Sequence, residues 1–424
     1  MKYIILRKVK IIDSESKYHL KKTDILIKEG IIDRIEKTIN ITEPFFEVDI
    51  KGLHISPGWL DLHVRLGEPG LEERETIKNG LKSAARGGFT TVLYMPSTKP
   101  VIQTKTDILF LLKKNQNNIV DLLPSGSITK NSMGQEITEM FDMHLNGAVA
   151  FTDDKNSIQN AMVMNIALEY VKNFDGLIMV TASNEDLENN GQVNEGFMST
   201  NMGLKPLPEL AENIMVMRDL EILRYTNSKL HISTISTKKS VQNIKKAKKE
   251  KLKISTDIAA HNLILNDEEI NTFNSNFKVK PPLRDEKTRL FLIENILNGT
   301  IDAVSSDHSP IQIEKKKCEF EQAEFGIIGL ETTFPIINTV LKGKMELSKI
   351  IDLISRNPRK ILKQKTPKIQ EGEKANMTLF DPNKTWRYQK EEIISKSKNT
   401  PFINYQFTGQ IIGIINNGQV EVNT

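Results

Sequence analysis

The chain has 424 residues, more than one average domain, and this length suits a barrel of about 250 residues with an added module. Hydrophobic residues make up 38% and charged residues 26% of the chain, and no apolar run approaches the roughly 20 residues that span a bilayer, so we expect no membrane protein. The net charge is only +4, and the lysine-rich run "NIKKAKKEKLK" has no aromatic residue for stacking on bases, so we expect no nucleic-acid binding.

The N-terminal stretch "MKYIILRKVKIID" alternates basic and apolar residues, which predicts a strand. It lacks the sustained apolar core and the small-residue cleavage site of a signal peptide. The chain has one cysteine, Cys318, which cannot form an internal disulfide and therefore fits a reducing compartment. We expect a cytoplasmic protein.

Both ends of the chain are rich in β-strand signals. "DILIKEGIIDRIE" reads as two alternating strands around a Glu-Gly turn, and "IIGIINNGQVEV" near the C-terminus reads as a hairpin around Asn-Gly. "GEKANMTLFDP", near position 372, adds a further strand. We predict that residues 1–56 and 366–424 form one small β-sandwich, with the barrel of residues 57–365 inserted between them.

The middle of the chain alternates short β-rich runs with helical patterns, as parallel βα units do. "RETIKNGLKSAARGG", for example, places Ile77, Leu81, Ala84 and Ala85 on one helical face and ends in a Gly pair. Eight such units predict an α/β protein with a closed (β/α)8 TIM-type barrel, whose chemistry lies at the C-terminal strand ends. The eight β-rich runs are "WLDLHV", "FTTVLYM", "VDLLPSGSI", "GAVAF", "LIMVT", "KLHIST", "LKIST" and "IDAVSSD".

The first of these strand ends is unusual. In "DLHVRLGEPG", residues 61–70, His63 and Arg65 are two apart on a strand, so both side chains point to the same side. Two histidines at this spacing would chelate a divalent metal, whereas arginine stays protonated and has no lone pair to donate.

The stretch "PGWLDLHVRLGEPGLEERETIKNGLKSAARGGFTTVLYMPSTKP" resembles the dihydroorotase signature, which reads D-x-H-x-H-x-R-x-P-G, then G-G-F-T-T and M-P-N-T. The chain is thus similar to type I dihydroorotases of the amidohydrolase superfamily. The resemblance implies a role in de novo pyrimidine biosynthesis, in which the family cyclises N-carbamoyl-L-aspartate to dihydroorotate. The reaction is reversible, and a hydroxide bound to the family's zinc acts in the hydrolytic direction. It covers nearly the whole chain, continuing in the family's order through "GAVAFTDD", "LHISTISTKKS", "NFKVKPPLRDEKTR", "GTIDAVSSDHSP", "FGIIGLETTFP" and "NPRKIL".

The family's six metal-site positions, carried over by the resemblance, hold only three residues of a coordinating type. Threonine hydroxyls are poor zinc ligands. The remaining set of His63, Asp154 and Asp307 is expected to bind zinc weakly or not at all, with Asp307 in the place of the family's catalytic aspartate. Arg65 is expected to replace the metal's charge by pairing with Asp307 or Asp154. The six positions are His63, Arg65, Asp154, Thr181, Thr234 and Asp307.

The resemblance also places a substrate shell, and most of it is substituted. The family's Arg, two Asn and His correspond here to Gly67, Ser97, Lys280 and Ile311. Phe325 and Gly326 match the family, whose residues there touch substrate largely through the backbone. The candidate substrate-binding residues are therefore Ser97, Lys280, Phe325 and Gly326.

Three interpretations follow. In the first, the chain is a catalytically degenerate dihydroorotase-like subunit, a homodimer or hetero-oligomer that assembles with aspartate carbamoyltransferase, as family precedent suggests. In the second, it is an active dihydroorotase with an unusual site. In the third, the pocket of Arg65, Lys280 and Ser97 makes it a hydrolase or binder of another small anionic molecule.

Overall fold

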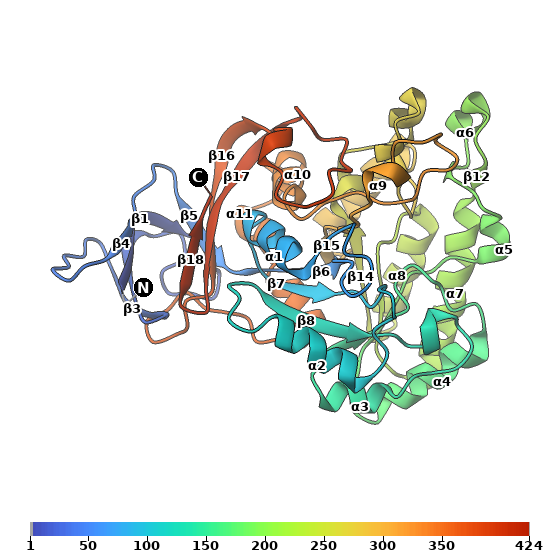
Figure 1. Cartoon of the computed structure of the whole chain (residues 1–424), viewed down its shortest axis with the longest axis horizontal. Coiled ribbons are helices and arrows are strands. Elements are labelled where there is room, and N and C mark those ends of the chain that lie inside the picture. The colour runs from blue at the N-terminus through green and yellow to red at the C-terminus, as the bar shows by residue number, and fades with distance from the viewer. Residues whose placement is uncertain (1–2, 424) are drawn as a thin grey trace.

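The computed structural model describes residues 3–423, and it places a barrel beside a sheet built from both ends of the chain (Figure 1). Eight parallel strands form the barrel in the order β15-β14-β13-β10-β9-β8-β7-β6. Each strand overlaps one of the eight β-rich runs, so the predicted (β/α)8 barrel is confirmed. The strands are β6 (Trp59–Val64), β7 (Phe89–Tyr94), β8 (Asp121–Gly126), β9 (Ala150–Phe151), β10 (Ile178–Val180), β13 (Leu230–Ile232), β14 (Ile254–Ala259) and β15 (Ala303–Ser305).

The barrel is closed just beyond the ends of its first and last strands. The backbone N–H of Arg65 donates to the carbonyl of His308 over 3.0 Å, and Val64 forms a parallel bridge with His308. Asp61 adds a side-chain link, because its Oδ2 accepts from the backbone N–H of Ser306 at 2.9 Å. The mouth residues on β6 and after β15 are therefore fixed against each other.

Helices cover the barrel, and α1 (Ile77–Arg86) shows why they form. It buries Ile77, Leu81, Ala84 and Ala85 as its periodicity predicts, and the Thr76 side chain caps its first turn. The other helices are α2 (Lys105–Lys114), α3 (Met140–Leu145), α4 (Ala161–Lys172), α5 (Glu185–Glu188), α6 (Phe197–Met202), α7 (Glu209–Thr226), α8 (Lys238–Lys249), α9 (Glu286–Leu297), α10 (Thr333–Leu341), α11 (Leu347–Asp352) and α12 (Arg356–Ile361). Short 3-10 turns span Lys130–Ser132, Ala260–Leu263, Asp267–Thr272, Ser275–Phe277, Ile313–Lys315 and Lys390–Glu392, and a small pair of strands joins β11 (Val193–Asn194) to β12 (Pro206–Leu207).

The two chain ends form one module, as predicted, and its strands hydrogen-bond into one mixed sheet. The order is β18-β17-β16-β5-β1-β2-β3, with β4 beside β1, so β5 and β16 join the N-terminal to the C-terminal strands. Met1, Lys2 and Thr424, the outermost residues of the predicted module, lie outside the described residues. The strands are β1 (Tyr3–Ile11), β2 (Lys22–Lys28), β3 (Ile31–Glu36), β4 (Phe46–Val48), β5 (His54–Pro57), β16 (Met377–Arg387), β17 (Gln406–Asn416) and β18 (Gln419–Val422).

Both predicted hairpins are present. Glu29 and Gly30 join β2 to β3, Asn417 and Gly418 join β17 to β18, and all four residues have positive φ. Two-residue hairpins need this conformation because it matches the twist of the flanking strands.

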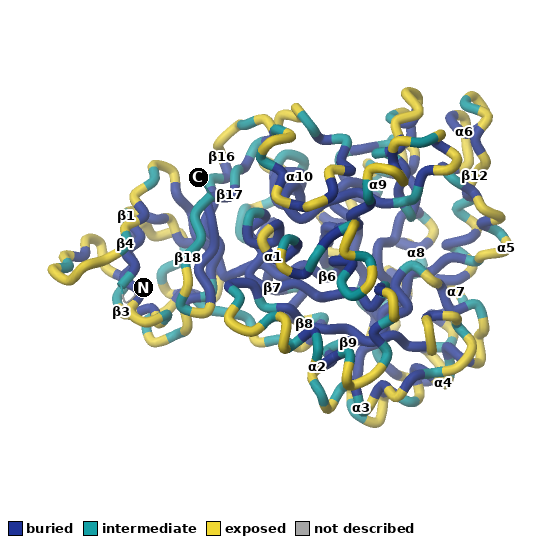
Figure 2. The backbone as a smooth tube through the Cα atoms, viewed as in Figure 1, coloured by how far each residue is buried: buried dark blue, intermediate teal, exposed yellow. Residues whose placement is uncertain are grey.

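The terminal sheet is anchored to the barrel by aromatic packing. Trp59 of β6 lies 4.7 Å from Phe334 of α10 and 5.5 Å from Phe380 of β16, measured between ring centroids. All three side chains are fully buried. Figure 2 shows that buried residues extend from the barrel into the terminal sheet. Among the described residues, no helix is both long enough and apolar enough to cross a membrane.

Candidate functional site

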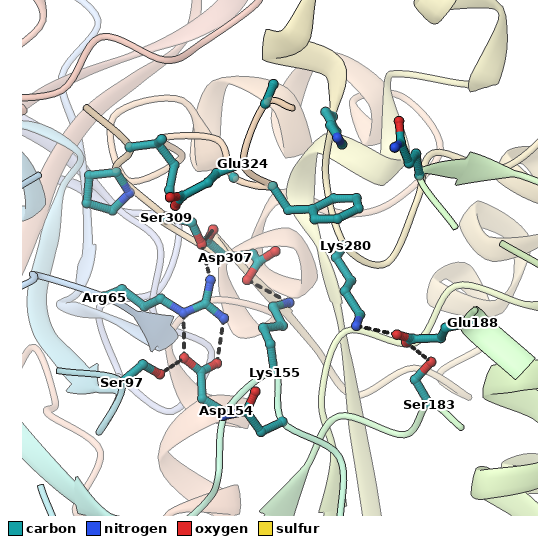
Figure 3. Close-up of a pocket in the computed structure, with 18 of the residues that line it drawn as sticks. Arg65, Ser97, Asp154, Lys155, Ser183, Glu188, Lys280, Asp307, Ser309 and Glu324 are labelled. Carbon is teal, nitrogen blue, oxygen red and sulfur yellow. Dashed lines mark hydrogen bonds and ion pairs between the residues drawn. The ribbon is translucent and has the colours of Figure 1, made fainter. Parts of the chain in front are cut away.

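A cavity of about 780 Å³ opens at the C-terminal ends of the barrel strands. Residues that follow different strands meet in it: Ser97 after β7, Asp154 and Lys155 after β9, and Asp307 after β15 (Figure 3). Barrel enzymes carry their chemistry at this face, because the loops there bring side chains from many strands together.

Arg65 makes a two-pronged ion pair with Asp154. Its Nε lies 2.5 Å from Oδ2 and its Nη2 lies 2.6 Å from Oδ1, a fork-to-carboxylate geometry that fixes both side chains (Figure 3). The third guanidinium nitrogen, Nη1, donates to Ser309 Oγ at 2.5 Å. Ser97 Oγ also donates to Asp154 Oδ2. Of the two partners considered for Arg65, Asp154 is the one that it contacts.

Asp307 has a different cation beside it, Lys155. The Lys155 Nζ lies 2.9 Å from Asp307 Oδ1, and it also donates to Thr234 Oγ1 over 3.3 Å. Sequence reasoning missed Lys155, although it directly follows Asp154 in "FTDDK" and so stands at the mouth of the barrel.

His63 lies next to the carboxylates of both ion pairs, and it is 1% exposed. Its Nε2 is 2.7 Å from Asp154 Oδ1 and 3.8 Å from Asp307 Oδ1. At the shorter distance the ring nitrogen donates its proton to the carboxylate, so its lone pair is not free for a metal. The three remaining family-type ligands are therefore gathered in one place, yet each is engaged by a neighbour.

These residues do not fit the zinc that the resemblance implies. Both oxygens of Asp154 accept from Arg65, and the Lys155 ammonium lies 2.9 Å from Oδ1 of Asp307. Within residues 3–423, no group of three or more His, Cys, Asp or Glu side chains is arranged to hold a metal ion. The positive charge at this site comes from the chain itself.

The pKa shifts follow from this arrangement. Burial opposes the ionisation of Asp154, but the Arg65 guanidinium holds the pKa of that carboxyl well below its usual value. Burial opposes the ionisation of Asp307 too, and the Lys155 ammonium lowers the pKa of that carboxyl below its usual value. Burial lowers the pKa of Lys155, an effect that Asp307 partly offsets. Two buried carboxylates are thus kept ionised by two partly buried cations.

The backbone at three family metal positions is in the left-handed region. Asp154, Thr234 and Asp307 have φ values of 56°, 51° and 49°. Such conformations are costly for residues other than glycine, and they cluster at functional sites. At these positions Thr234 offers a hydroxyl, and Asp307 is paired with the Lys155 ammonium.

The candidate substrate-binding residues all line the same cavity. Lys280 Nζ donates to Glu188 Oε2 at 2.6 Å, and Ser183 Oγ donates to the other oxygen of Glu188 (Figure 3). The backbone N–H of Gly326 donates to the carbonyl of Lys278, so this N–H is already paired. The Phe325 ring lies 5.0 Å from Lys278 Nζ.

The remaining family positions divide between the cavity and its surroundings. Gly67 and Ile311 line the cavity. Thr181 borders a small neighbouring hollow, and its buried hydroxyl has no hydrogen-bond partner.

The charged side chains around the cavity largely satisfy one another. Arg65 pairs with Asp154, Lys155 with Asp307, Lys280 with Glu188, and Arg74 with Glu324 at 2.9 Å. Lys278 donates instead to the backbone carbonyls of Phe320 and Glu321. An anionic ligand would therefore have to compete with carboxylates or carbonyls for each of these five cations.

Comparisons with known proteins agree with this architecture. Residues 52–240 match the family model described as dihydro-orotase-like. A dihydroorotase of Carboxydothermus hydrogenoformans is 39% identical over 393 residues, which are 92% of this chain and 91% of the relative. One of Caldicellulosiruptor saccharolyticus is 37% identical, and the match covers 98% of each chain.

A solved structure agrees at the level of the fold. An L-hydantoinase (dihydropyrimidinase) from Arthrobacter aurescens superposes with a TM-score of 0.86 at 24% identity, over 100% of this chain and 98% of that one. This likeness supports the barrel and its terminal sheet. The two dihydroorotases are 37% to 39% identical over more than 90% of the chain, so this chain belongs to the dihydroorotase family.

Proposed function

We propose that this dihydroorotase-family protein is catalytically degenerate and is retained as an assembly subunit with aspartate carbamoyltransferase. The observation that carries the first half of the proposal is the pair of internal cations. Arg65 holds Asp154, and Lys155 holds Asp307, where the family would hold metal.

Losing a metal that activates water would have a large energetic effect on catalysis. Metal coordination lowers the pKa of water from 15.7 to about 7, and each pKa unit is worth about 1.36 kcal/mol, so losing this activation costs about 12 kcal/mol of nucleophile formation. A guanidinium and an ammonium balance the carboxylate charge, but neither offers an open coordination position to water. They replace the charge of the metal without its chemistry.

Retention as a subunit is supported by what has been kept. The barrel, the terminal sheet and their shared aromatic core are complete, whereas Arg65, Thr181 and Thr234 stand where the resemblance places metal-binding histidines. Random decay would also have damaged the core, since most core substitutions destabilise a fold. Aspartate carbamoyltransferase is proposed because inactive chains of this family have that partner by family precedent.

The two alternatives receive less support from the geometry. An active dihydroorotase would need Asp307 free to accept a proton, but its carboxylate faces the Lys155 ammonium. A binder of another small anion would need Arg65 and Lys280 free, and both are paired with carboxylates.

The test begins with metal and turnover on the full chain, expressed with zinc supplied. Elemental analysis should find well under one zinc per chain, and dihydroorotate hydrolysis should equal the buffer rate, with Asp307→Ala changing nothing measurable. Stoichiometric zinc that is lost in His63→Ala, or a turnover that Asp307→Ala abolishes, would show an active enzyme.

The proposed assembly with aspartate carbamoyltransferase is tested separately. Mixed with aspartate carbamoyltransferase from the same organism, the chain should co-elute with it in size-exclusion chromatography, each protein alone being the control. Separate elution over a range of concentrations up to tens of micromolar would remove this half of the proposal and leave the first half standing.

A further inference from the structure

A second cavity lies beside the barrel mouth, and of the described residues only Ile311 lines both cavities. Its volume is about 1040 Å³, close to the upper end of the range typical of small-molecule sites. Its walls come from the 3-10 turns after β14, the loop after β15 and the segment that joins β16 to β17. We call it the lysine cavity, after the five lysines that line it: Lys316, Lys317, Lys390, Lys396 and Lys398.

None of these five lysines forms an ion pair with a carboxylate in the described part of the chain. Lys316 Nζ donates to the carbonyl of Ser275 over 2.8 Å, and Lys396 Nζ donates to the carbonyl of Glu72 over 2.7 Å. Lys398 donates to two backbone carbonyls as well. A carbonyl oxygen accepts a hydrogen bond without cancelling the charge, and an ammonium has three donors, so each of these lysines keeps a donor for a ligand.

The charge of the lysine cavity is strongly positive. Lys317 and Lys390 are exposed and have no hydrogen-bond or ion-pair partner within residues 3–423. Only two carboxylates, those of Glu73 and Glu314, stand against five lysines in the lining of the cavity. A concave surface with one dominant sign of charge concentrates ligands of the opposite sign. An anion would enter here without displacing a carboxylate, whereas at the barrel mouth the cations are largely paired.

The deepest of the five lysines adds to this argument. Lys316 is 6% exposed, and burial lowers the pKa of its ammonium to about 7. Lys278 lowers this pKa further, while Glu324 and Cys318 raise it. A buried ammonium without a counter-charge is costly, and a bound anion would remove that cost. The inner end of the cavity therefore favours an anionic ligand.

One wall of the lysine cavity offers a flat ring and an amide. Phe273 is 51% exposed, and its φ of 54° is a conformation that bulky residues rarely adopt and that is found at functional sites. The side-chain amide of Asn276 has no hydrogen-bond partner in the described part of the chain. An exposed aromatic ring stacks on nucleobases, and an amide pairs with the polar edge of a base.

We propose that the lysine cavity binds a nucleoside triphosphate, with its phosphates among the lysines and its base on Phe273. A triphosphate carries several negative charges, which suits a group of lysines that lack carboxylate partners. Inorganic phosphate would leave the Phe273 ring without a contact. Because this site lies outside the barrel mouth, the proposal does not depend on whether the chain is catalytically degenerate.

Isothermal titration calorimetry of the full chain with ATP tests the phosphate part of the proposal. ATP should bind at one site per chain with a Kd below about 100 μM. The double variant Lys317→Gln, Lys390→Gln should weaken this binding at least tenfold, and its fold should be unaffected because both lysines are exposed and unpaired. Lys239→Gln with Lys245→Gln is the matched control, because it removes the same charge from exposed positions of α8 and should leave the Kd unchanged.

The base part of the proposal is tested with a second variant and a second probe. Phe273→Leu should weaken ATP binding at least fivefold, since stacking on an aromatic ring contributes substantially to the binding of a base. The same variant should bind tripolyphosphate, which has no base, as the wild type does. ATP should bind the wild type more tightly than tripolyphosphate does.

Four outcomes would overturn the proposal. The first is that ATP fails to bind the wild type at millimolar concentration. The second is that the α8 control weakens binding as much as the Lys317, Lys390 variant, which would show attraction by overall charge only. The third is that ATP and tripolyphosphate bind equally and Phe273→Leu changes neither. The fourth is that Lys280→Gln abolishes ATP binding while the Lys317, Lys390 variant keeps it, which would place the ligand in the barrel mouth.

Discussion

At the scale of single residues, the site is governed by charge balance. Asp154 and Asp307 are 2% and 3% exposed, and an unpaired carboxylate at such depth costs several kcal/mol. The chain supplies two cations, and each carboxylate takes one of them. The free energy of unfolding that these residues contribute depends on their pairing, so double-mutant cycles can measure it.

The ion pair of Arg65 with Asp154 makes the first prediction. Arg65→Met leaves Asp154 buried without its cation and should lower the free energy of unfolding by about 3 kcal/mol. Adding Asp154→Asn should recover part of this loss, because contacting residues are not additive. Urea unfolding of the wild type, both single variants and the double variant gives the coupling energy.

A second cycle, of Arg65→Met with Asp307→Asn, is the control. Its coupling should be smaller, since Asp307 has Lys155 beside it. Strict additivity in both cycles would mean that the guanidinium points elsewhere in solution, as it would toward a bound anion.

The same pair predicts how the Arg65→Met defect depends on pH. In the wild type the folded pKa of Asp154 is lowered, so its contribution to stability is present above the unfolded pKa of about 3.9 and is lost as pH falls through the folded value. Without Arg65, burial dominates and should raise the folded pKa above the unfolded one. Asp154 is then able to take up a proton in the folded state as pH falls.

The difference in unfolding free energy between wild type and Arg65→Met should therefore be largest near pH 7 and should shrink toward pH 4. Urea titrations at pH 7, 5.5 and 4.5 measure it. A difference that is constant over this range would mean that Asp154 does not keep its charge buried in the variant.

At the scale of elements, the barrel and the terminal sheet depend on each other. Phe380 lies on β16 of the sheet, but its ring packs on Trp59 of β6 and lies 5.2 Å from Phe334 of α10. A strand from the C-terminal part of the chain thus completes the packing around the first strand of the barrel. The two units are expected to lose stability together when this contact is cut.

Phe380→Ala should lower the free energy of unfolding by about 3 to 5 kcal/mol, because it opens a cavity at a fully buried position. Trp59 fluorescence, recorded in a Trp386→Phe background, should report the barrel losing stability in step with the far-UV circular dichroism of the whole chain. Phe197→Ala is the matched control, since Phe197 is 81% exposed and should change stability by no more than about 0.5 kcal/mol. A loss of signal from the sheet with an unchanged Trp59 transition would show that the barrel is independent of the sheet.

At the scale of the whole molecule, a complete barrel and terminal sheet surround a site in which two carboxylates are paired with cations of the chain. Asp154, Thr234 and Asp307 follow three different barrel strands, β9, β13 and β15, and all three have positive φ. Because Arg65 and Lys155 neutralise the carboxylates internally, the fold has no electrostatic need for a metal at the mouth.

The sequence by itself determined the eight strands, the two hairpins and the union of both chain ends, because period-two alternation and turn residues such as Asn417-Gly418 are local signals. The spacing of two likewise placed His63 and Arg65 on one side of the chain at the end of β6, and the family motifs identified Asp154 and Asp307. Only the tertiary structure decided which charged residues pair. Arg65 pairs with Asp154, 89 positions away in the sequence, and Lys280 pairs with Glu188, 92 positions away. Lys155 pairs with Asp307. The physical reason is that ion pairing depends on distances of a few ångströms between segments far apart in the chain, and no local pattern contains those distances.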